Sequence, residues 1–191
     1  MGFEISDQIR ALNAQLQHFM DEHIYPRERE WHEWCHDPEH LWEVPAWYDD
    51  IRDKAKAEGL WNLFLPEEYA PWSPGLTNVE IAPLFETMSK VMWAQGVFNC
   101  NAPDRGNMEV LAKYGTSEQQ EQWLKPLLAG EIRSAYAMTE PQVASSDATN
   151  MELEIRRDGD ERGAGRGSGG AGVGKPKGKG KKGKKGRGAR S

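Results

Sequence analysis

The chain contains little cysteine, no long apolar run and, in its last thirty residues, no acidic or aromatic side chain. Its two cysteines, Cys35 and Cys100, form no framework of disulfide bridges, which favours a reduced, intracellular setting. No apolar run approaches the roughly 20 residues that cross a bilayer. The N-terminus carries Glu4 and Asp7 and resembles neither a secretory signal nor a transit peptide. We therefore expect a soluble intracellular protein, with cytoplasm, mitochondrion and peroxisome all left open.

Charge divides the 191 residues into two parts of opposite sign. Residues 1–161 contain all 30 Asp and Glu but 13 of the 24 Lys and Arg, a net charge of −17, whereas residues 162–191 contain the other 11 basic residues, +11. All eight Trp precede residue 124, and twelve of the twenty Gly follow residue 162. A Gly/Lys/Arg-rich segment cannot bury enough apolar surface to offset its ordering entropy, so we expect residues 162–191 to be disordered. Their charge suits weak, salt-dependent binding to nucleic acid or an anionic membrane.

Apolar residues at three- and four-residue spacing predict helices in the first part of the chain. The first helix starts behind a cap at Ser6 and should end or kink at Pro26. The Trp- and His-rich stretch 31–42 predicts a short helix followed by a loop. A further helix fits between Pro45, which suits a first turn, and Gly59, which suits a C-terminal cap.

Two capping boxes mark later helix starts. The first spans Thr77–Glu80, and Pro83 is tolerated in that helix if it begins slightly later. The second spans Ser117–Gln120, after a helix expected over about 103–114. The apolar run 60–65 reads as a buried connection.

After Gly130 the spacing changes from helical to alternating. Residues 132–138 and 151–155 predict two strands with a break between them at Pro141. The fold class expected is therefore mainly α: an N-terminal helical domain over 1–130, the first strands of an incomplete β domain over 131–161, and a disordered basic tail over 162–191.

Residues 32–36, His-Glu-Trp-Cys-His, match the H-E-x-x-H motif of zinc hydrolases, and His40 is a conceivable third ligand. The extended form of the motif has Gly and His where this chain has Glu39 and Trp42, and the Asp-Pro pair at 37–38 interrupts the helix that would hold both ligands. We expect an exposed helix end here and assign no metal ligand.

An ordered series of residues between Tyr114 and Asp147 resembles one family, the flavin-dependent acyl-CoA dehydrogenases. Its parts, in order, are Gly115-Thr116, Glu118-Gln119, Trp123-Leu124, Pro126-Leu127, Gly130, Tyr136-Ala137-Met138-Thr139-Glu140-Pro141 and Gln142-Val143-Ala144-Ser145-Ser146-Asp147. The Val-Ala-Ser-Ser-Asp ending is similar to the long-chain branch with multidomain members. The resemblance covers roughly residues 5–160, with a weaker match at 59–66.

The resemblance implies FAD as cofactor and five residues that hold it. Tyr136, Met138 and Thr139 match the segment whose backbone lies along the flavin ring and whose Thr hydroxyl bonds near the accepting nitrogen. Ser146, with Ser145 as its neighbour, matches the serine that contacts flavin phosphate or acyl-CoA. Ser146 is therefore also the expected substrate-binding residue.

The resemblance also implies α,β-dehydrogenation of an acyl-CoA thioester, with an electron-transfer flavoprotein or similar acceptor as partner. In the family the carboxylate base lies in a later helical domain, so no catalytic residue is assigned, and we expect the chain to be inactive alone.

The abrupt change of composition after 160–161 suggests a frameshift, a mispredicted exon or a truncation. A homo-oligomer stays open. The alternative is a non-catalytic helical module whose basic tail binds nucleic acid or anionic membrane, and a zinc hydrolase comes third.

Overall fold

The computed structural model describes residues 4–40, 43–136, 140, 147–150, 152–158 and 161–166. It divides between Tyr136 and Ala137 into a first unit, residues 1–136, and a second unit, residues 137–191. Among the described residues, no helix combines the length and the apolar character needed to cross a membrane.

The first helical stretch changes its winding three times. Helix α1 (Asp7–Phe19) is capped by Ser6, whose hydroxyl accepts a hydrogen bond from the amide of Ile9 at 3.3 Å. A π-helical turn (Met20–Ile24) and a 3₁₀ turn (Tyr25–Arg27) containing Pro26 lead into helix α2 (Glu28–His36). The predicted cap and the interruption near Pro26 are both confirmed, because proline has no amide proton for the α-helical ladder.

Helix α3 (Trp47–Ala57) ends before Gly59, which has a φ of 73° and turns the chain into the buried connection predicted over 60–65. Helix α4 (Asn78–Met88) begins at the capping box of Thr77 with Glu80, as predicted. Pro83 lies inside this helix, whereas the sequence suggested a later start. The capping box fixes the start at Asn78, so the carbonyl four residues before Pro83 has no intrahelical donor.

The second half of the first unit contains four short helices: α5 (Ala94–Val97), α6 (Asp104–Tyr114), α7 (Ser117–Gln119) and α8 (Lys125–Ala129), with a π-helical turn (Gln120–Leu124) before α8. The second capping box is formed by Thr116 and Gln119, one residue earlier than predicted. Thr116 has the extended backbone that an N-cap needs, and Ser117 is already helical.

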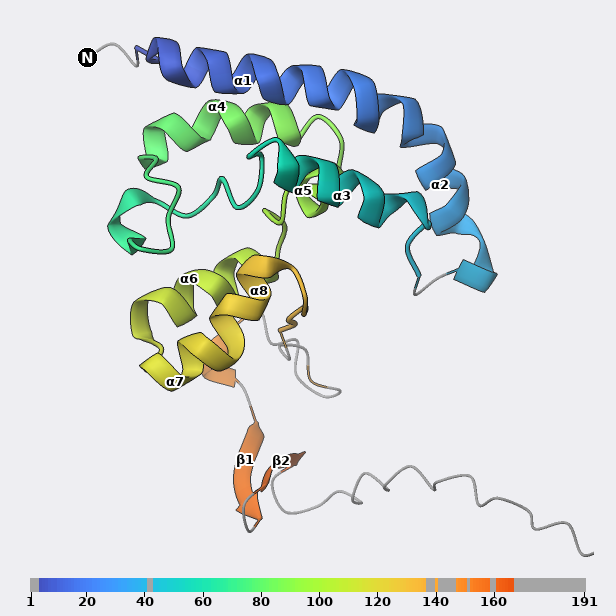
Figure 1. Ribbon diagram of the computed structural model, residues 1–191. Coiled ribbons are helices and arrows are strands. Elements are labelled where there is room, and N and C mark those ends of the chain that lie inside the picture. Colours follow the sequence, from blue (N-terminus) through green and yellow to red (C-terminus); the bar gives the residue numbers. More distant parts are fainter. Residues whose placement is uncertain are drawn as a thin grey trace, which may run out of the picture. The chain divides into compact units, whose positions relative to one another are not determined.

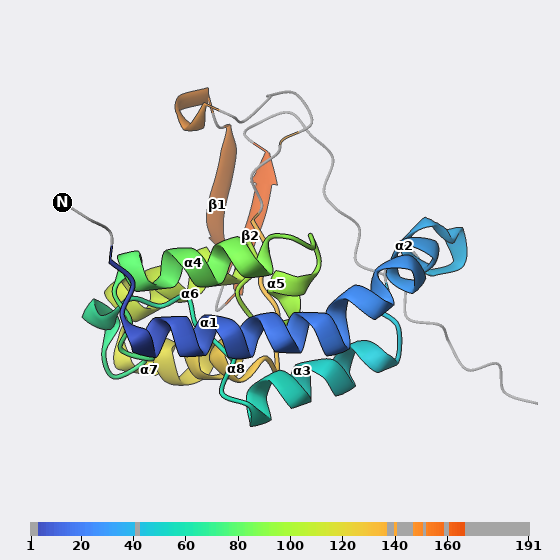
Figure 2. The same ribbon diagram turned by 90° about the horizontal axis from the view of Figure 1, so that it is seen from above.

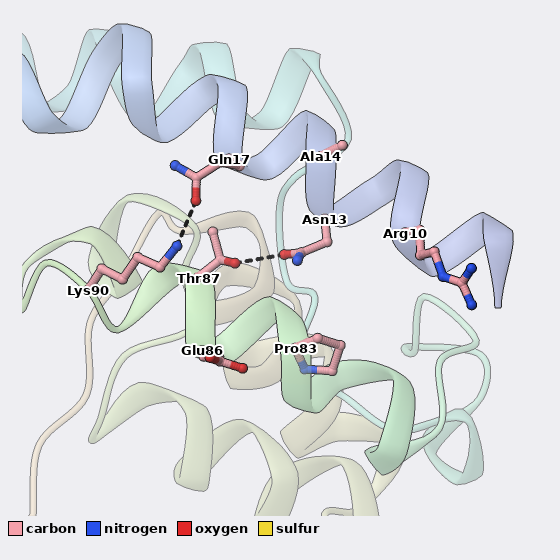
Figure 3. Close-up of a pocket in the computed structure, with 8 residues that line it drawn as sticks. All are labelled: Arg10, Asn13, Ala14, Gln17, Pro83, Glu86, Thr87 and Lys90. Atoms are coloured by element: carbon pink, nitrogen blue, oxygen red, sulfur yellow. Dashed lines mark hydrogen bonds between the residues drawn. The ribbon is translucent and has the colours of Figure 1, made fainter. Parts of the chain in front are cut away.

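Helices α1 and α4 lie side by side (Figures 1 and 2). A groove of about 410 Å³ runs along their seam (Figure 3), where Thr87 donates to Asn13 and Lys90 donates to Gln17, both at 2.8 Å. The Thr87 bond joins the two helices directly, and the Lys90 bond joins α1 to the residues just after α4.

A single apolar core connects the helices of the first unit. Phe19 of α1 packs edge-to-face on Phe98, with ring centroids 5.4 Å apart. A second aromatic group joins α2 to α3, because Trp31 stacks on Trp93 at 5.0 Å and contacts Trp47 edge-on at 6.2 Å. Aromatic pairs of this kind add about 0.5–1.5 kcal/mol beyond area burial.

The second unit contains an antiparallel pair of strands, β1 (Leu153–Asp158) and β2 (Glu161–Arg166), in which Leu153 pairs with Arg166. The strand predicted over 151–155 is present, shifted toward the C-terminus. Residues 162–166, which the composition assigns to the tail, form most of β2. The strand predicted over 132–138 is absent from its described part, 132–136, since a strand requires a partner to hydrogen-bond with and the described residues of the first unit offer none.

Candidate functional site

The segment 131–136 leads from helix α8 into the signature Tyr136–Pro141. Of the five residues predicted to hold FAD, Tyr136 is described, and Met138, Thr139, Ser145 and Ser146 lie outside the described residues. The contacts that fix the segment 131–136 are therefore the part of the candidate site that the described residues show.

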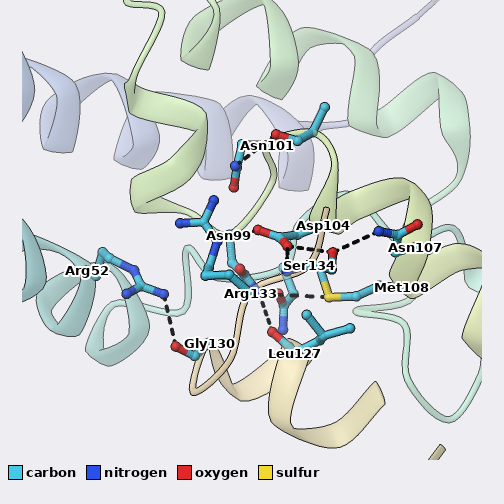
Figure 4. A network of polar contacts seen from close by, with 12 residues as sticks. Arg52, Asn99, Asn101, Asp104, Asn107, Met108, Leu127, Gly130, Arg133 and Ser134 are labelled. Carbon is cyan, nitrogen blue, oxygen red and sulfur yellow. Dashed lines mark hydrogen bonds and ion pairs between the residues drawn. The ribbon is translucent and has the colours of Figure 1, made fainter. Parts of the chain in front are cut away.

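Asp104, the first residue of α6, holds the segment from one side (Figure 4). Its side chain is 1% exposed and accepts three hydrogen bonds: from Arg133 Nε at 2.5 Å, from the Ser134 amide at 2.6 Å and from the Ser134 hydroxyl at 2.7 Å. The carboxylate also lies in the first turn of a helix, where the helix dipole favours negative charge. Asp104 thus binds side chain and backbone just two residues before Tyr136.

Asn107, one turn further along α6, completes this contact. Its side-chain amide donates to the Ser134 hydroxyl at 2.8 Å. The hydroxyl thus donates to Asp104 and accepts from Asn107, which fixes its orientation. We call Asp104, Asn107, Arg133 and Ser134 the α6 clamp.

A second set of polar residues holds the end of α8, where the segment begins. Asn99, buried and with a φ of 56°, donates to the Leu127 carbonyl at 3.0 Å and to the side chain of Asn62 at 2.8 Å. Asn62, with a φ of 59°, donates in turn to the Leu128 carbonyl at 2.8 Å. The last carbonyls of a helix have no partner within it, and here two loop asparagines, Asn99 and Asn62, supply donors for them.

The turn at Gly130 fixes the direction in which the chain leaves α8. Gly130 has a φ of 73°, and its carbonyl accepts from Arg52 at 3.3 Å. Trp61 donates its indole N–H to the Leu128 carbonyl at 2.7 Å, and a Cβ on Gly130 would come within 2.7 Å of the Trp61 ring. Only glycine combines this backbone angle with this close approach.

Tyr136 lies against helix α6 at the end of the held segment. A Cβ on Gly106 would overlap the Tyr136 hydroxyl, so the hydroxyl end of the tyrosine lies against this glycine. The Tyr136 side chain is nevertheless 58% exposed. The residue is therefore positioned by α6 while much of its ring stays open to contact.

An apolar hollow of about 590 Å³ adjoins the clamp. Its rim includes Asn107, Arg133 and Ser134, and the rest of its lining is apolar: Val110, Leu111, Trp123, Leu127 and Ile132. Trp123 and Val110 are about half exposed. A hollow with an apolar lining and a few oriented polar groups is typical of a binding surface.

Two titratable groups have environments that bear on chemistry. Burial raises the pKa of the Cys100 thiol to about 12, so this cysteine is an inert core residue. Hydrogen bonds from the hydroxyl and amide of Thr149 lower the pKa of Asp147, which starts the 3₁₀ turn Ala148–Asn150. In its described contacts the signature aspartate therefore caps a turn.

Sequence reasoning missed the residues that position the segment. Asp104 was a charged residue at a predicted helix start, and Asn62 and Asn99 were loop asparagines without a motif around them. One usable signal was present: asparagine is enriched at positive φ, so an Asn inside an apolar run such as 60–65 can mark a specialised turn.

The comparisons with known proteins agree with this architecture. The family model for the acyl-CoA dehydrogenase N-terminal domain matches residues 6–131. The chain belongs to the acyl-CoA dehydrogenase family. It is 50% identical over 159 residues to mouse acyl-CoA dehydrogenase family member 10, covering 81% of this chain and 15% of that protein. It is also 50% identical over 149 residues to human acyl-CoA dehydrogenase family member 11, covering 76% of this chain and 18% of that protein.

A solved structure shows the same fold. A Mycobacterium abscessus chain, described as "a putative acyl-CoA dehydrogenase", superposes with a TM-score of 0.75 at 46% identity, covering 85% of this chain and 42% of that chain. The resemblance stated from the sequence and the mainly helical fold class are thereby confirmed. The chain spans less than half of the length of these acyl-CoA dehydrogenase relatives.

Proposed function

We propose that this chain supplies the N-terminal helical part and the first flavin-contacting segment of an FAD-dependent acyl-CoA dehydrogenase. The observation that carries the proposal is the α6 clamp, in which buried Asp104 binds both the side chain of Arg133 and the backbone of Ser134. A clamp on the residues directly before Tyr136 gives the signature Tyr136–Pro141 a fixed starting point. Preorganised backbone is what a cofactor site requires.

The side chains of the proposed site are of types that bind FAD. Tyr136 offers a half-exposed aromatic ring at the end of the held segment, and Thr139, Ser145 and Ser146 offer hydroxyls of the type that bond a flavin edge or a phosphate. Within the proposal, Tyr136, Met138 and Thr139 contact the flavin ring, and Ser145 and Ser146 contact phosphate. Ser146 also contacts the acyl-CoA.

FAD, when bound, supplies the two-electron acceptor for α,β-dehydrogenation of an acyl-CoA thioester. In that reaction the α-proton goes to a carboxylate base, the β-hydrogen leaves as hydride and a carbon–carbon double bond forms. In this proposal the residues of this chain bind and orient FAD and the acyl-CoA. We assign the carboxylate base to the part of the family fold that the chain does not span. An electron-transfer flavoprotein is the proposed acceptor of the electrons, and a homo-oligomer is the proposed assembly of the complete enzyme.

The test is a titration of FAD with the purified 191-residue chain, followed by flavin fluorescence and the visible absorption spectrum. We expect binding that Thr139→Ala weakens and that Thr149→Ala, a threonine on the 3₁₀ turn after the signature, leaves unchanged. Lack of any spectral change, or equal effects of the two variants, would refute the assignment of the flavin segment. A dye-reduction assay with acyl-CoA tests the other half of the proposal, because turnover by this chain alone would mean that it contains its own base.

A second function rests on the basic segment. Residues 162–191 carry a charge of +11 and no acidic group, which suits binding to a polyanion. Residues 167–191, which follow strand β2, carry nine of these eleven basic residues. Retention on heparin that disappears when residues 167–191 are deleted would support this function. A polyanion contact and a flavin site use different residues. The heparin experiment therefore tests the polyanion contact, and the FAD titration tests the flavin site.

A further inference from the structure

Helix α2 carries two exposed histidines, one turn apart, that the flavin proposal does not use. His32 and His36 occupy positions i and i+4 on one face of α2, and both are exposed. Their rings stack with centroids 4.1 Å apart and an interplanar angle of 25°. Two imidazoles at this spacing on a helix are a known arrangement for chelating one metal ion.

A hydrogen bond fixes the tautomer of the neutral His36 ring. Its Nδ1 lies 2.7 Å from the carbonyl oxygen of His32. A carbonyl oxygen only accepts, so Nδ1 carries the proton, and in the neutral ring the Nε2 lone pair is then free to bind a metal ion. Metal-binding histidines commonly donate their second ring N–H to a backbone carbonyl in this way, which fixes the tautomer and the ring orientation.

The other polar side chains nearby already have partners. Glu33 pairs with Arg29 at 2.8 Å. His40 stacks on Trp34 with centroids 3.7 Å apart and faces the carboxylate of Glu43 at 3.4 Å. Glu33 is therefore not oriented as the general base of a zinc hydrolase, and His40 is turned to a different partner from the histidine pair.

Within the described ranges, no three His, Cys, Asp or Glu side chains are grouped closely enough to hold a metal ion. A catalytic zinc site uses three protein ligands, so the histidine pair does not meet that requirement. Two imidazoles with water in the remaining positions make a simpler, non-catalytic site.

We propose that His32 and His36 bind one divalent transition-metal ion, of the class Cu²⁺, Ni²⁺ or Zn²⁺, on the exposed face of α2. Imidazole nitrogen suits these ions. His36 is the last residue of α2, where the helix dipole favours a cation, and a metal bridge between positions i and i+4 joins the last two turns of the helix. Both views place α2 at the end of α1, away from helix α6, which carries Asp104 and Asn107 of the clamp (Figures 1 and 2).

The experiment is calorimetric titration of Ni²⁺ and Zn²⁺ into the tag-free chain. We expect one ion per chain, and both His32→Ala and His36→Ala should raise Kd about tenfold or more. Loss of a ligand's hydrogen-bond partner already costs about tenfold, and each of these variants removes one of two ligands. The matched controls are His18→Ala, an exposed histidine on α1, and Cys35→Ser, which removes a thiol next to His36. Both should bind as the unaltered chain does.

A second readout separates binding from misfolding. Because bound metal stabilises the state that binds it, Ni²⁺ should raise the Tm of the chain and of Cys35→Ser, and should leave the Tm of His36→Ala unchanged. The exposure of His32 and His36 predicts unchanged far-ultraviolet circular dichroism in the variants. No binding by the unaltered chain at millimolar metal would overturn the proposal. Equal binding by His36→Ala, or binding lost with Cys35→Ser, would do the same.

Discussion

Replacing Asp104 by alanine removes the acceptor on which the α6 clamp depends. Asp104 is buried and accepts two hydrogen bonds from Ser134 and one from Arg133. Each hydrogen bond to a charged group contributes about 1.5–3 kcal/mol. The Arg133 side chain is 53% exposed and can return to water, so its bond contributes about 0–1 kcal/mol. We therefore expect Asp104→Ala to lower the free energy of unfolding by about 3–7 kcal/mol.

Urea unfolding followed by tryptophan fluorescence measures this loss, because all eight Trp precede residue 124 and report on the first unit. A loss of this size corresponds to a fall in Tm of about 6–28 °C for a chain of this length. Asp104→Asn keeps an oxygen acceptor for Ser134 but loses the charge, so its loss should be intermediate. Hydrogen exchange of residues 131–136 should accelerate in the alanine variant.

Asp147→Ala is the matched control for the clamp prediction. Asp147 also accepts from a hydroxyl and an amide, those of Thr149, but it is exposed and lies in the second unit. Its replacement should leave the tryptophan-detected midpoint unchanged. Equal midpoints for Asp104→Ala and Asp147→Ala would refute the reasoning that burial makes the Asp104 bonds strong.

Two further predictions concern the turn after α8 and the thiols. Gly130→Ala should destabilise the fold by clearly more than Gly75→Ala, and thermal melts of the two variants measure the difference. Both glycines have positive φ, which costs about 1–2 kcal/mol for alanine. A Cβ would overlap Trp61 at Gly130 but would meet open space at Gly75. A thiol reagent should label Cys35 alone in the native chain at pH 8–9 and both cysteines in urea, since the Cys100 thiol has a pKa of about 12 in the fold. Between pH 9 and 12 the unfolded thiol is ionised and the folded one is not, so unfolding stability should fall by about 1.4 kcal/mol per pH unit relative to Cys100→Ala. Native labelling of Cys100, or parallel pH curves, would contradict this.

The helix starts were predictable where the signal is local. Ser6 and Thr77 cap helices as expected, because an N-cap needs only a short polar side chain and an amide three residues later. Where two candidate N-cap residues were adjacent, the prediction was wrong: Thr116 caps the helix for which Ser117 was predicted. Both residues have the right side chain, and the backbone angle that distinguishes them depends on the preceding helix.

For the strands and the candidate site, too, features with a local sequence pattern were predicted and long-range contacts were not. Alternation at 151–155 located β1 approximately, but the pairing with residues 161–166 was missed, since the glycine-rich composition there gives no alternating pattern. The signature Tyr136–Pro141 was found by its order of residues. The contact from Asp104 to Ser134, which holds the residues before the signature, spans about thirty positions and has no local pattern.

By itself, then, the sequence determined the family and the helical fold of the first part of the chain. It also determined that the apolar run 60–65 is a buried connection, and that residues 1–161 and 162–191 carry opposite net charges. Each of these follows from composition, spacing or short-range capping. The tertiary structure decided which polar residues act together: Asp104 with Ser134, and Asn99 with Asn62 and the end of α8. Such pairs form because buried donors and acceptors must be satisfied by whatever the packing brings near, and that is set by the fold as a whole.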